Sequence, residues 1–530
     1  MARIRHGLAA GLVLLLGVLL PAAPAHAVVY VPISGAGSSW SGPAVYQWAS
    51  NVKQYGMTVS YADTGSSDGR NRFKSGVVDF AVSEIPYGLT DGGVVDYPPT
   101  TKFSYMPIVA GGTSLMYNLK IGNSRVTNLR LSGEVVAKIF TGVITNWSDP
   151  AIKADNPRLN LPARKIVPVV RSDGSGTSAQ FTMWLSTKYP NLWNDYCRKA
   201  GRSTPCGFTS NYPVVPGLGF TAQSGSNGVS GYVKQDGNIG TITYVEYSYA
   251  VNLNFPVAKV LNKAGYFIEP TASSVAVALV QAQIKSDLTQ KLEGVYDATD
   301  KRAYPLSSYS YMIIPVDQVS GSFSLDKGRT LAAFAYYFLC EGQQQAESLG
   351  YSPLPVNLVA AGKAQVDRIP GAVPKPIDGR SCNNPTLRPD GKNALAEKAP
   401  QPKECDRGGT DMCASGTGGA RYNTPLLAAP TGGASPGASA SPGAGTGTGG
   451  TGTGGTGTGS GTVIDPDTGQ PIGTGGGTGT GGDVTATTVD LAAQDRSTRR
   501  GMLLLAAATL VAVVLLPPLL ARTLRNRRRP

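Results

Sequence analysis

A strand-to-helix turn rich in glycine and serine recurs three times in this chain. In VVRSDGSGTSAQF (169–181), an apolar run ends at an arginine, crosses a Gly/Ser turn and enters a stretch with helical spacing of apolar residues. The turns SGAGSSWSGP (34–43) and ADTGSSDG (62–69) have the same setting. Helix N-termini carry unpaired N–H groups and a partial positive charge, so such turns suit an anion. A single turn of this kind indicates an ordinary capped helix start. Three such turns together with one arginine make an anion-binding site as well supported as ordinary helix capping.

Predicted strands and helices alternate along the chain, which is typical of an α/β fold. Residues 77–82 and 237–250 have the pattern of strands, and residues 274–292 and 331–339 have the pattern of helices. Glu84 follows the first of these strands, where open α/β sheets present ligand groups. Its carboxylate would accept a proton from hydrogen phosphate and would repel sulfate. A solvated loop charge is the alternative interpretation of Glu84.

The two ends of the chain have the patterns of targeting segments. Residues 1–27 combine a basic start, an apolar run and a small-residue cleavage site, which is typical of a secretory signal peptide. Residues 501–521 are uncharged and long enough to cross a bilayer, and the arginine-rich tail 522–530 would stay on the cytoplasmic side. We therefore expect a single-pass protein of the cell membrane with its N-terminal domain extracellular. Residues 429–495, rich in Gly, Thr and Ser, predict a disordered tether.

The composition excludes several kinds of enzyme. Both histidines, His6 and His26, lie in the predicted signal peptide, so the remaining chain lacks the base of Ser–His–Asp and Cys–His mechanisms and the most common zinc ligand. The segment RSDGSGTS lacks the lysine of a nucleotide-binding P-loop. We expect no catalytic residue, no metal and no cofactor. The net charge of +13 suits an anionic ligand, but the exterior part has no Lys/Arg-rich run, so we expect no nucleic-acid partner.

Six cysteines in a secreted chain predict disulfides. Cys197 and Cys206 flank the polar loop CRKAGRSTPC and form the favoured pair. Three pairings remain open for the other four, which are Cys340, Cys382, Cys405 and Cys413. One of these pairings joins the last two across the segment DRGGTDM and leaves the first two for each other. A zinc site is the alternative, but the chain has no CxxC pair.

Several segments resemble, in their order and spacing, the periplasmic-type phosphate-binding protein of the phosphate ABC importer. They are GAGSSWSGPAVYQWA, YADTGSSDGRNRFKSGVVDFAVSEIP, FTGVITNWSDPAI, VVRSDGSGTSAQFTMWL and ITYVEYSYA. The resemblance implies an α/β fold with two lobes, a Venus-flytrap of the periplasmic binding protein type II kind that closes over one phosphate. We therefore divide the exterior part into a binding domain (28–371) and a Cys-containing extension (372–428), to which the resemblance assigns no role.

Carried over by position, the resemblance implies a phosphate-binding set in the three turns and at the end of the strand before Glu84. A bidentate arginine fork, neutral hydroxyl donors and helix N-termini together suit a phosphate. Asp173 matches the aspartate that holds the arginine in place, and Trp40 would contribute its backbone N–H. The implied ligands are Ser39, Trp40, Ser66, Glu84, Arg171, Ser175, Gly176 and Thr177.

Two positions depart from the family pattern. The family usually has Asp in place of Glu84 and Thr-Phe in place of Ser39-Trp40. Because glutamate is longer by a methylene, the oxyanion selectivity stays open. We expect an extracellular, membrane-tethered solute-binding protein that captures inorganic phosphate in an interlobe cleft for an ABC permease. The alternatives are a surface oxyanion-binding or sensing module that is not coupled to transport, and a phosphatase.

Overall fold

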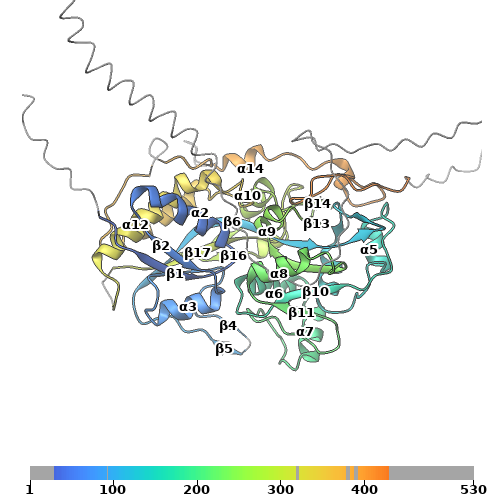
Figure 1. The fold of residues 1–530 in the computed structure, drawn as a ribbon, viewed down its shortest axis with the longest axis horizontal. Coiled ribbons are helices and arrows are strands. Elements are labelled where there is room, and N and C mark those ends of the chain that lie inside the picture. The colour runs from blue at the N-terminus through green and yellow to red at the C-terminus, as the bar shows by residue number, and fades with distance from the viewer. Residues whose placement is uncertain (1–28, 92, 318–320, 378–381, 387–391, 429–530) are drawn as a thin grey trace, which may run out of the picture. The chain divides into compact units, whose positions relative to one another are not determined.

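The computed structural model describes residues 29–428, apart from 92, 318–320, 378–381 and 387–391 (Figure 1). The predicted signal peptide, disordered tether, membrane span and basic tail all lie outside the described residues. The described residues therefore comprise the expected binding domain and its C-terminal extension (372–428).

The predicted single-pass membrane localisation is contradicted. Within the described residues, no helix is both long and apolar enough to cross a bilayer. The longest described helix, α12 (Leu325–Leu339), has 15 residues, whereas a span requires about 20 apolar residues. The predicted span, 501–521, is not among the described residues.

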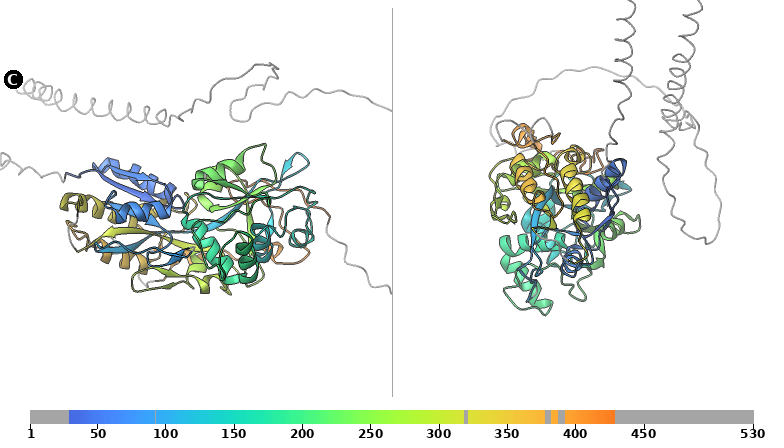
Figure 2. Two further views of the ribbon diagram at one scale, coloured as in Figure 1. Left: turned by 90° about the horizontal axis from the view of Figure 1, so that it is seen from below. Right: turned by 90° about the vertical axis from the view of Figure 1, so that its left-hand side faces the viewer.

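The main sheet has the strand order β11 (Thr221–Gln223), β10 (Val167–Arg171), β12 (Thr241–Glu246), β6 (Phe103–Tyr117), β17 (Ser307–Pro315), β3 (Phe80–Ser83), β1 (Ile33–Gly37), β2 (Val59–Ala62). The first part of its central strand, β6 (Phe103–Tyr117), pairs antiparallel with β17 (Ser307–Pro315). The last part of β6 pairs antiparallel with β12 (Thr241–Glu246) and β13 (Val257–Leu261). Strand β6 therefore joins two lobes, which appear as two groups of elements in Figures 1 and 2. The predicted α/β fold with two lobes is confirmed.

Each lobe combines parallel strands with covering helices. Lobe 1 contains β17, α12, β1 (Ile33–Gly37), β2 (Val59–Ala62), β3 (Phe80–Ser83), α2 (Gly42–Asn51), α3 (Ser66–Lys74) and α13 (Val356–Val366). Lobe 2 contains β12, β13, β9 (Arg130–Leu131), β10 (Val167–Arg171), β11 (Thr221–Gln223), α4 (Gly133–Phe140), α5 (Pro150–Asp155), α6 (Gly176–Lys188), α7 (Pro190–Lys199), α8 (Gly225–Lys234) and α9 (Tyr247–Asn252).

The remaining elements are short. They are η1 (Val52–Tyr55), β4 (Thr90–Asp91), β5 (Val94–Val95), β7 (Lys120–Ile121), β8 (Ser124–Arg125), β14 (Phe267–Ile268), α10 (Ala272–Leu279), β15 (Gln283–Ile284), β16 (Gln290–Lys291), α11 (Glu293–Tyr296), η2 (Glu341–Gln345), α14 (Ala394–Lys398) and η3 (Glu404–Asp406).

Two predicted elements end earlier than their sequence pattern indicated. The strand-like run 237–250 becomes helical after Glu246, because this side chain accepts a hydrogen bond from Ser248 N (2.6 Å) and so caps α9. The predicted helix 274–292 ends with α10 at Leu279, and a short β15–β16 hairpin follows. The hairpin turn includes Leu288 at a φ of 66°, a conformation that cannot continue a helix.

The disulfides join all six cysteines. Cys197 is bonded to Cys206, as predicted. Of the three pairings left open for the others, the structure has Cys405–Cys413 and Cys340–Cys382. The last of these ties the C-terminal extension to the end of α12, and Asn384 beside it donates a hydrogen bond to the Leu354 carbonyl (3.1 Å). The start of the extension is therefore held on lobe 1.

The later part of the extension is held on lobe 2. Arg130, which is fully buried, donates hydrogen bonds to the carbonyl oxygens of Cys405 (3.2 Å) and Asp411 (2.9 Å). Lys259 and Asp406 form a buried ion pair at 2.6 Å. Between these two ends, α14 packs against α10. Because a buried arginine and a buried lysine of lobe 2 find their partners in the extension, this segment is part of the folded body.

Candidate anion-binding site

The three Gly/Ser turns lie where predicted, between a strand and a helix. Strands β1 and β2 are parallel neighbours, and so are β1 and β3, so the turns after β1 and β2 and the Glu84 side chain after β3 share one edge of the sheet. The third turn, after β10, faces them from lobe 2. The Gly176 N–H donates to Ser66 Oγ (3.1 Å), and the Ser67 N–H donates to the Gly174 carbonyl (3.0 Å). The two lobes therefore meet at the predicted site.

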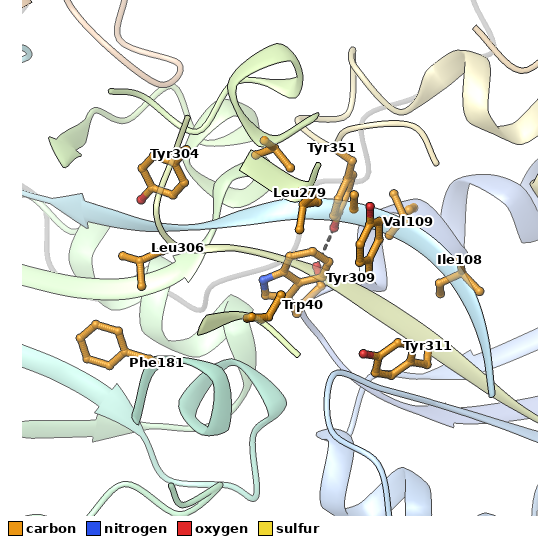
Figure 3. Close-up of a cluster of buried hydrophobic side chains, with 14 of the residues drawn as sticks. Trp40, Ile108, Val109, Phe181, Leu279, Tyr304, Leu306, Tyr309, Tyr311 and Tyr351 are labelled. Carbon is orange, nitrogen blue, oxygen red and sulfur yellow. Dashed lines mark hydrogen bonds between the residues drawn. The ribbon is translucent and has the colours of Figure 1, made fainter. Parts of the chain in front are cut away.

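The first turn is buried and contacts lobe 2. Ser39 Oγ lies 2.9 Å from Ser226 Oγ. The backbone N–H of Trp40, predicted as an anion donor, donates instead to Ser38 Oγ (3.0 Å). The Trp40 ring packs in an aromatic cluster, and Tyr351 donates its hydroxyl proton to the Trp40 carbonyl at 2.6 Å (Figure 3). Trp40 thus anchors the turn, while Ser39 faces the opposite lobe.

Glu84 is fully buried and is bound by serine hydroxyls. Ser66 Oγ donates to Glu84 Oε2 (2.9 Å), and Ser310 Oγ donates to Glu84 Oε1 (2.9 Å). Burial raises the pKa of the Glu84 carboxyl above its ordinary value, and the hydrogen bonds from serines and the charge of Arg171 offset only part of this rise. The alternative of a solvated loop charge does not describe this side chain.

We expect the raised pKa of Glu84 to make the chain less stable as the pH rises. A carboxyl whose pKa is raised on folding binds more protons in the folded state, so the free energy of unfolding falls between the unfolded and the folded pKa. A difference of one pH unit between these two pKa values amounts to about 1.4 kcal/mol. Urea unfolding of the wild type and of Glu84→Gln from pH 4 to 8 measures the effect. The free energy of unfolding of the wild type, minus that of Glu84→Gln, should fall as the pH rises from 4 to 8. A difference that stays constant over this range would contradict the prediction.

Arg171 presents a fixed guanidinium at the site. It is 2% exposed, its Nε donates to Asp173 Oδ1 (2.7 Å), and Nη2 donates to Asp173 Oδ2. Burial favours a higher pKa for Asp173, but the hydrogen bonds and charge of Arg171 outweigh it and lower that pKa. Nη1 donates to Ser226 Oγ (3.3 Å). A guanidinium has five N–H groups, so beyond these contacts one remains on each terminal nitrogen for an anion.

The N-terminus of α6 supplies further donors. Ser175 caps the helix by accepting a hydrogen bond from Ser178 N (3.1 Å), so its own hydroxyl proton is free to point outward. Thr177 Oγ1 is buried and has no hydrogen-bond partner among the described residues. An unpaired buried hydroxyl costs about 1–3 kcal/mol, so a ligand oxygen that accepts from it would be stabilising.

Gly176 lies at a point where the two lobes are in close contact. A Cβ atom built on it would lie 2.0 Å from Glu84 Oε2 and 2.4 Å from Ser66 Oγ, which both belong to lobe 1. Only a residue without a side chain fits between the α6 backbone and the Glu84 carboxyl.

Three contacting residues were not predicted. Ser38, in the first turn beside the predicted Ser39, forms a hydrogen bond with the Glu84 carboxyl that lowers its pKa. Ser226 lies in TAQSGSNG, a fourth strand–Gly/Ser turn–helix segment between β11 and α8, and its composition could have identified it. Ser310 lies inside the buried strand β17 and has no local signal, because only the pairing of β17 with β3 brings it to Glu84. The structure therefore adds Ser38, Ser226 and Ser310 to the predicted set. Three members of that set have their predicted donor bonded to another protein group: the Trp40 N–H to Ser38, the Ser66 hydroxyl to Glu84, and the Gly176 N–H to Ser66.

Comparison with known proteins identifies the family to which this chain belongs. Residues 22–341 match the family model described as the PBP superfamily domain. The phosphate-binding protein PstS of Xylella fastidiosa (strain Temecula1) is 33% identical over 333 residues, which cover 62% of this chain and 83% of the relative. The chain belongs to the PstS family of phosphate-binding proteins.

A further relative agrees with this membership. A PstS of Haemophilus influenzae is 30% identical over 334 residues, covering 63% of this chain and 92% of the relative. Among solved structures, a periplasmic phosphate-binding protein, PfluDING, bound with phosphate is 20% identical, covers 63% of this chain and 93% of its own, and has a TM-score of 0.49. The PstS relatives are named as binding proteins, and the prediction that the chain is not an enzyme is confirmed.

Proposed function

We propose that this member of the PstS family captures inorganic phosphate between its two lobes and delivers it to an ABC permease. The observation that carries the proposal is the buried Arg171 fork, fixed by Asp173, at the point where the N-termini of α3 and α6 meet. A cation fork and two helix N-termini in a buried position favour a small oxyanion. The names of the PstS relatives favour phosphate.

The proposed ligand groups come from both lobes. From lobe 1 they are the hydroxyls of Ser39 and Ser66 and the carboxyl of Glu84. From lobe 2 they are the Arg171 fork, the α6 backbone at Gly176, and the hydroxyls of Ser175 and Thr177. An ionised Glu84 carboxylate can accept the proton of hydrogen phosphate, whereas sulfate at neutral pH has no proton to donate and would be repelled. Glu84 thus supports phosphate over sulfate.

Calorimetric titration of the purified chain tests the proposal. We expect phosphate to bind with a dissociation constant of about 1 μM or lower, since several charge-assisted contacts of about 1.5–3 kcal/mol each are available. Sulfate, titrated under the same conditions, should bind much more weakly. Heat from sulfate together with none from phosphate would overturn the proposal. Phosphate uptake by cells with and without the chain then tests delivery to a permease.

A further inference from the structure

We propose that Ser226, at the N-terminus of α8, is a positioning residue that fixes the hydroxyl proton of Ser39 and the guanidinium of Arg171 for the bound anion. This inference rests on the proposed function and adds a residue to it. Ser226 belongs to the fourth Gly/Ser turn, which lies outside the set implied by the resemblance.

The sheet places the fourth turn beside the arginine. Strands β10 and β11 are parallel neighbours, with Arg171 opposite Gln223, so the turns that follow them share one edge of lobe 2. The same turn also holds the aspartate partner of the arginine, since Gly225 N–H donates to Asp173 Oδ1 (2.9 Å). The β11–α8 turn therefore supports both members of the Arg171–Asp173 pair.

Ser226 itself connects both lobes. Its side chain is fully buried, and its Oγ accepts a hydrogen bond from Arg171 Nη1 (3.3 Å). Its backbone N–H donates to Ser39 Oγ (3.1 Å), and the two hydroxyl oxygens lie 2.9 Å apart. Ser39 belongs to lobe 1, whereas Ser226 and Arg171 belong to lobe 2. The contact between the two serines can therefore exist only while the lobes are together.

The contact between the two serines determines where the Ser39 hydroxyl proton can point. A serine hydroxyl has one proton to donate and two lone pairs to accept with. One lone pair of Ser39 Oγ is taken by the Ser226 N–H. When the Ser226 hydroxyl donates to Ser39, the second lone pair is filled as well, and the Ser39 proton has to point to another acceptor. An oxyanion beside Ser39 is such an acceptor, so anion binding and this direction of the hydrogen bond reinforce each other.

The opposite direction of the hydrogen bond between Ser39 and Ser226 is less favourable for anion binding. When Ser39 donates to Ser226, the Ser226 oxygen accepts from both Ser39 and Arg171, and Ser39 keeps no proton for a ligand. Ser226 thus converts Ser39 from a group that can donate or accept into a donor. It achieves this through Ser39 and Arg171 and without touching the anion itself.

The test compares Ser226→Ala with Ser226→Thr by phosphate calorimetry and by stopped-flow dissociation. We expect Ser226→Ala to weaken phosphate binding about 10-fold, mainly through faster dissociation, because the lost contact belongs to the closed state. Ser226→Thr keeps the hydroxyl and should stay within about 3-fold of the wild type. Ser230→Ala is the matched control, since this buried serine one turn along α8 donates to the Ser226 carbonyl within the helix (2.7 Å).

A double-variant cycle separates positioning from a merely structural role. In a Ser39→Ala background, Ser226→Ala should cost clearly less than its 10-fold effect in the wild type, because the proton it directs is gone. Equal costs in both backgrounds, unchanged affinity of Ser226→Ala, or a Thr variant as weak as the Ala variant would each overturn the inference. A wild-type chain that does not bind phosphate would instead overturn the proposed function.

Discussion

Arg171→Ala is expected to weaken phosphate binding about 100- to 1,000-fold. Two N–H groups of this fork remain for the anion after its contacts with Asp173 and Ser226, and each charge-assisted contact is worth about 1.5–3 kcal/mol. Removing the guanidinium also leaves the Asp173 carboxylate without its charge partner, so the site would present a negative group to an anion. Calorimetry with phosphate at neutral pH measures the loss.

Two further variants make this test specific. Arg171→Lys keeps a positive charge but lacks the planar fork, and it should fall between the wild type and the alanine variant. Arg329→Ala removes an arginine on α12 whose side chain is 40% exposed and which pairs with Asp326 one turn away. It should leave the phosphate affinity unchanged. Retention of wild-type affinity by Arg171→Ala would mean that the anion binds elsewhere.

Gly176→Ala is expected to reduce phosphate binding at least about 100-fold by keeping the lobes apart. The added Cβ would lie 2.0 Å from Glu84 Oε2, far inside van der Waals contact. The carboxyl cannot turn aside without losing its hydrogen bonds from Ser66 and Ser310, and it is buried on all sides. Because both atoms that clash belong to lobe 1, the strain is relieved when the lobes separate.

The thermal stability of the same variant distinguishes this effect from unfolding. Alanine is a better helix former than glycine by about 1 kcal/mol, so α6 itself should tolerate the change. Gly231→Ala is the control, since a Cβ at that position of α8 meets nothing within 4 Å. It should bind phosphate like the wild type. If Gly176→Ala binds phosphate normally, the predicted contact between Gly176 and Glu84 is not part of the bound state.

Local sequence patterns predicted the parts of the site that are built locally. Each strand–turn–helix unit is a single stretch of chain, so the positions of the three turns and of Arg171 followed from glycine, serine and apolar spacing, whereas the choice of Ser66 as a ligand came from the family resemblance. The same pattern was present in the β11–α8 turn, where Ser226 could have been found. The fold class followed for the same reason, because alternating strands and helices leave few architectures open.

The contacts that the sequence could not predict depend on pairing between strands that are far apart in the chain. Ser310 reaches Glu84 because β17, more than 200 residues further along the chain, pairs with β3. The burial of Glu84 and its raised pKa depend on this pairing and on the approach of Gly176 from the other lobe. The prediction of one helix over 274–292 was wrong for a local reason, because the polar second half of this segment forms the β15–β16 hairpin.

The route of the C-terminal extension limits how the lobes can move. The chain passes from one lobe to the other in β6, on the way back to β17, and again in the extension, whose ends are fixed by Cys340–Cys382 on one side and by the partners of Arg130 on the other. Two lobes that are joined by three segments of the chain have less freedom to rotate relative to each other than two lobes joined by two segments. A rotation that separates Ser39 from Ser226 must therefore also displace the extension or break one of its attachments, which are Cys340–Cys382 on lobe 1 and the contacts of Arg130 and Lys259 on lobe 2.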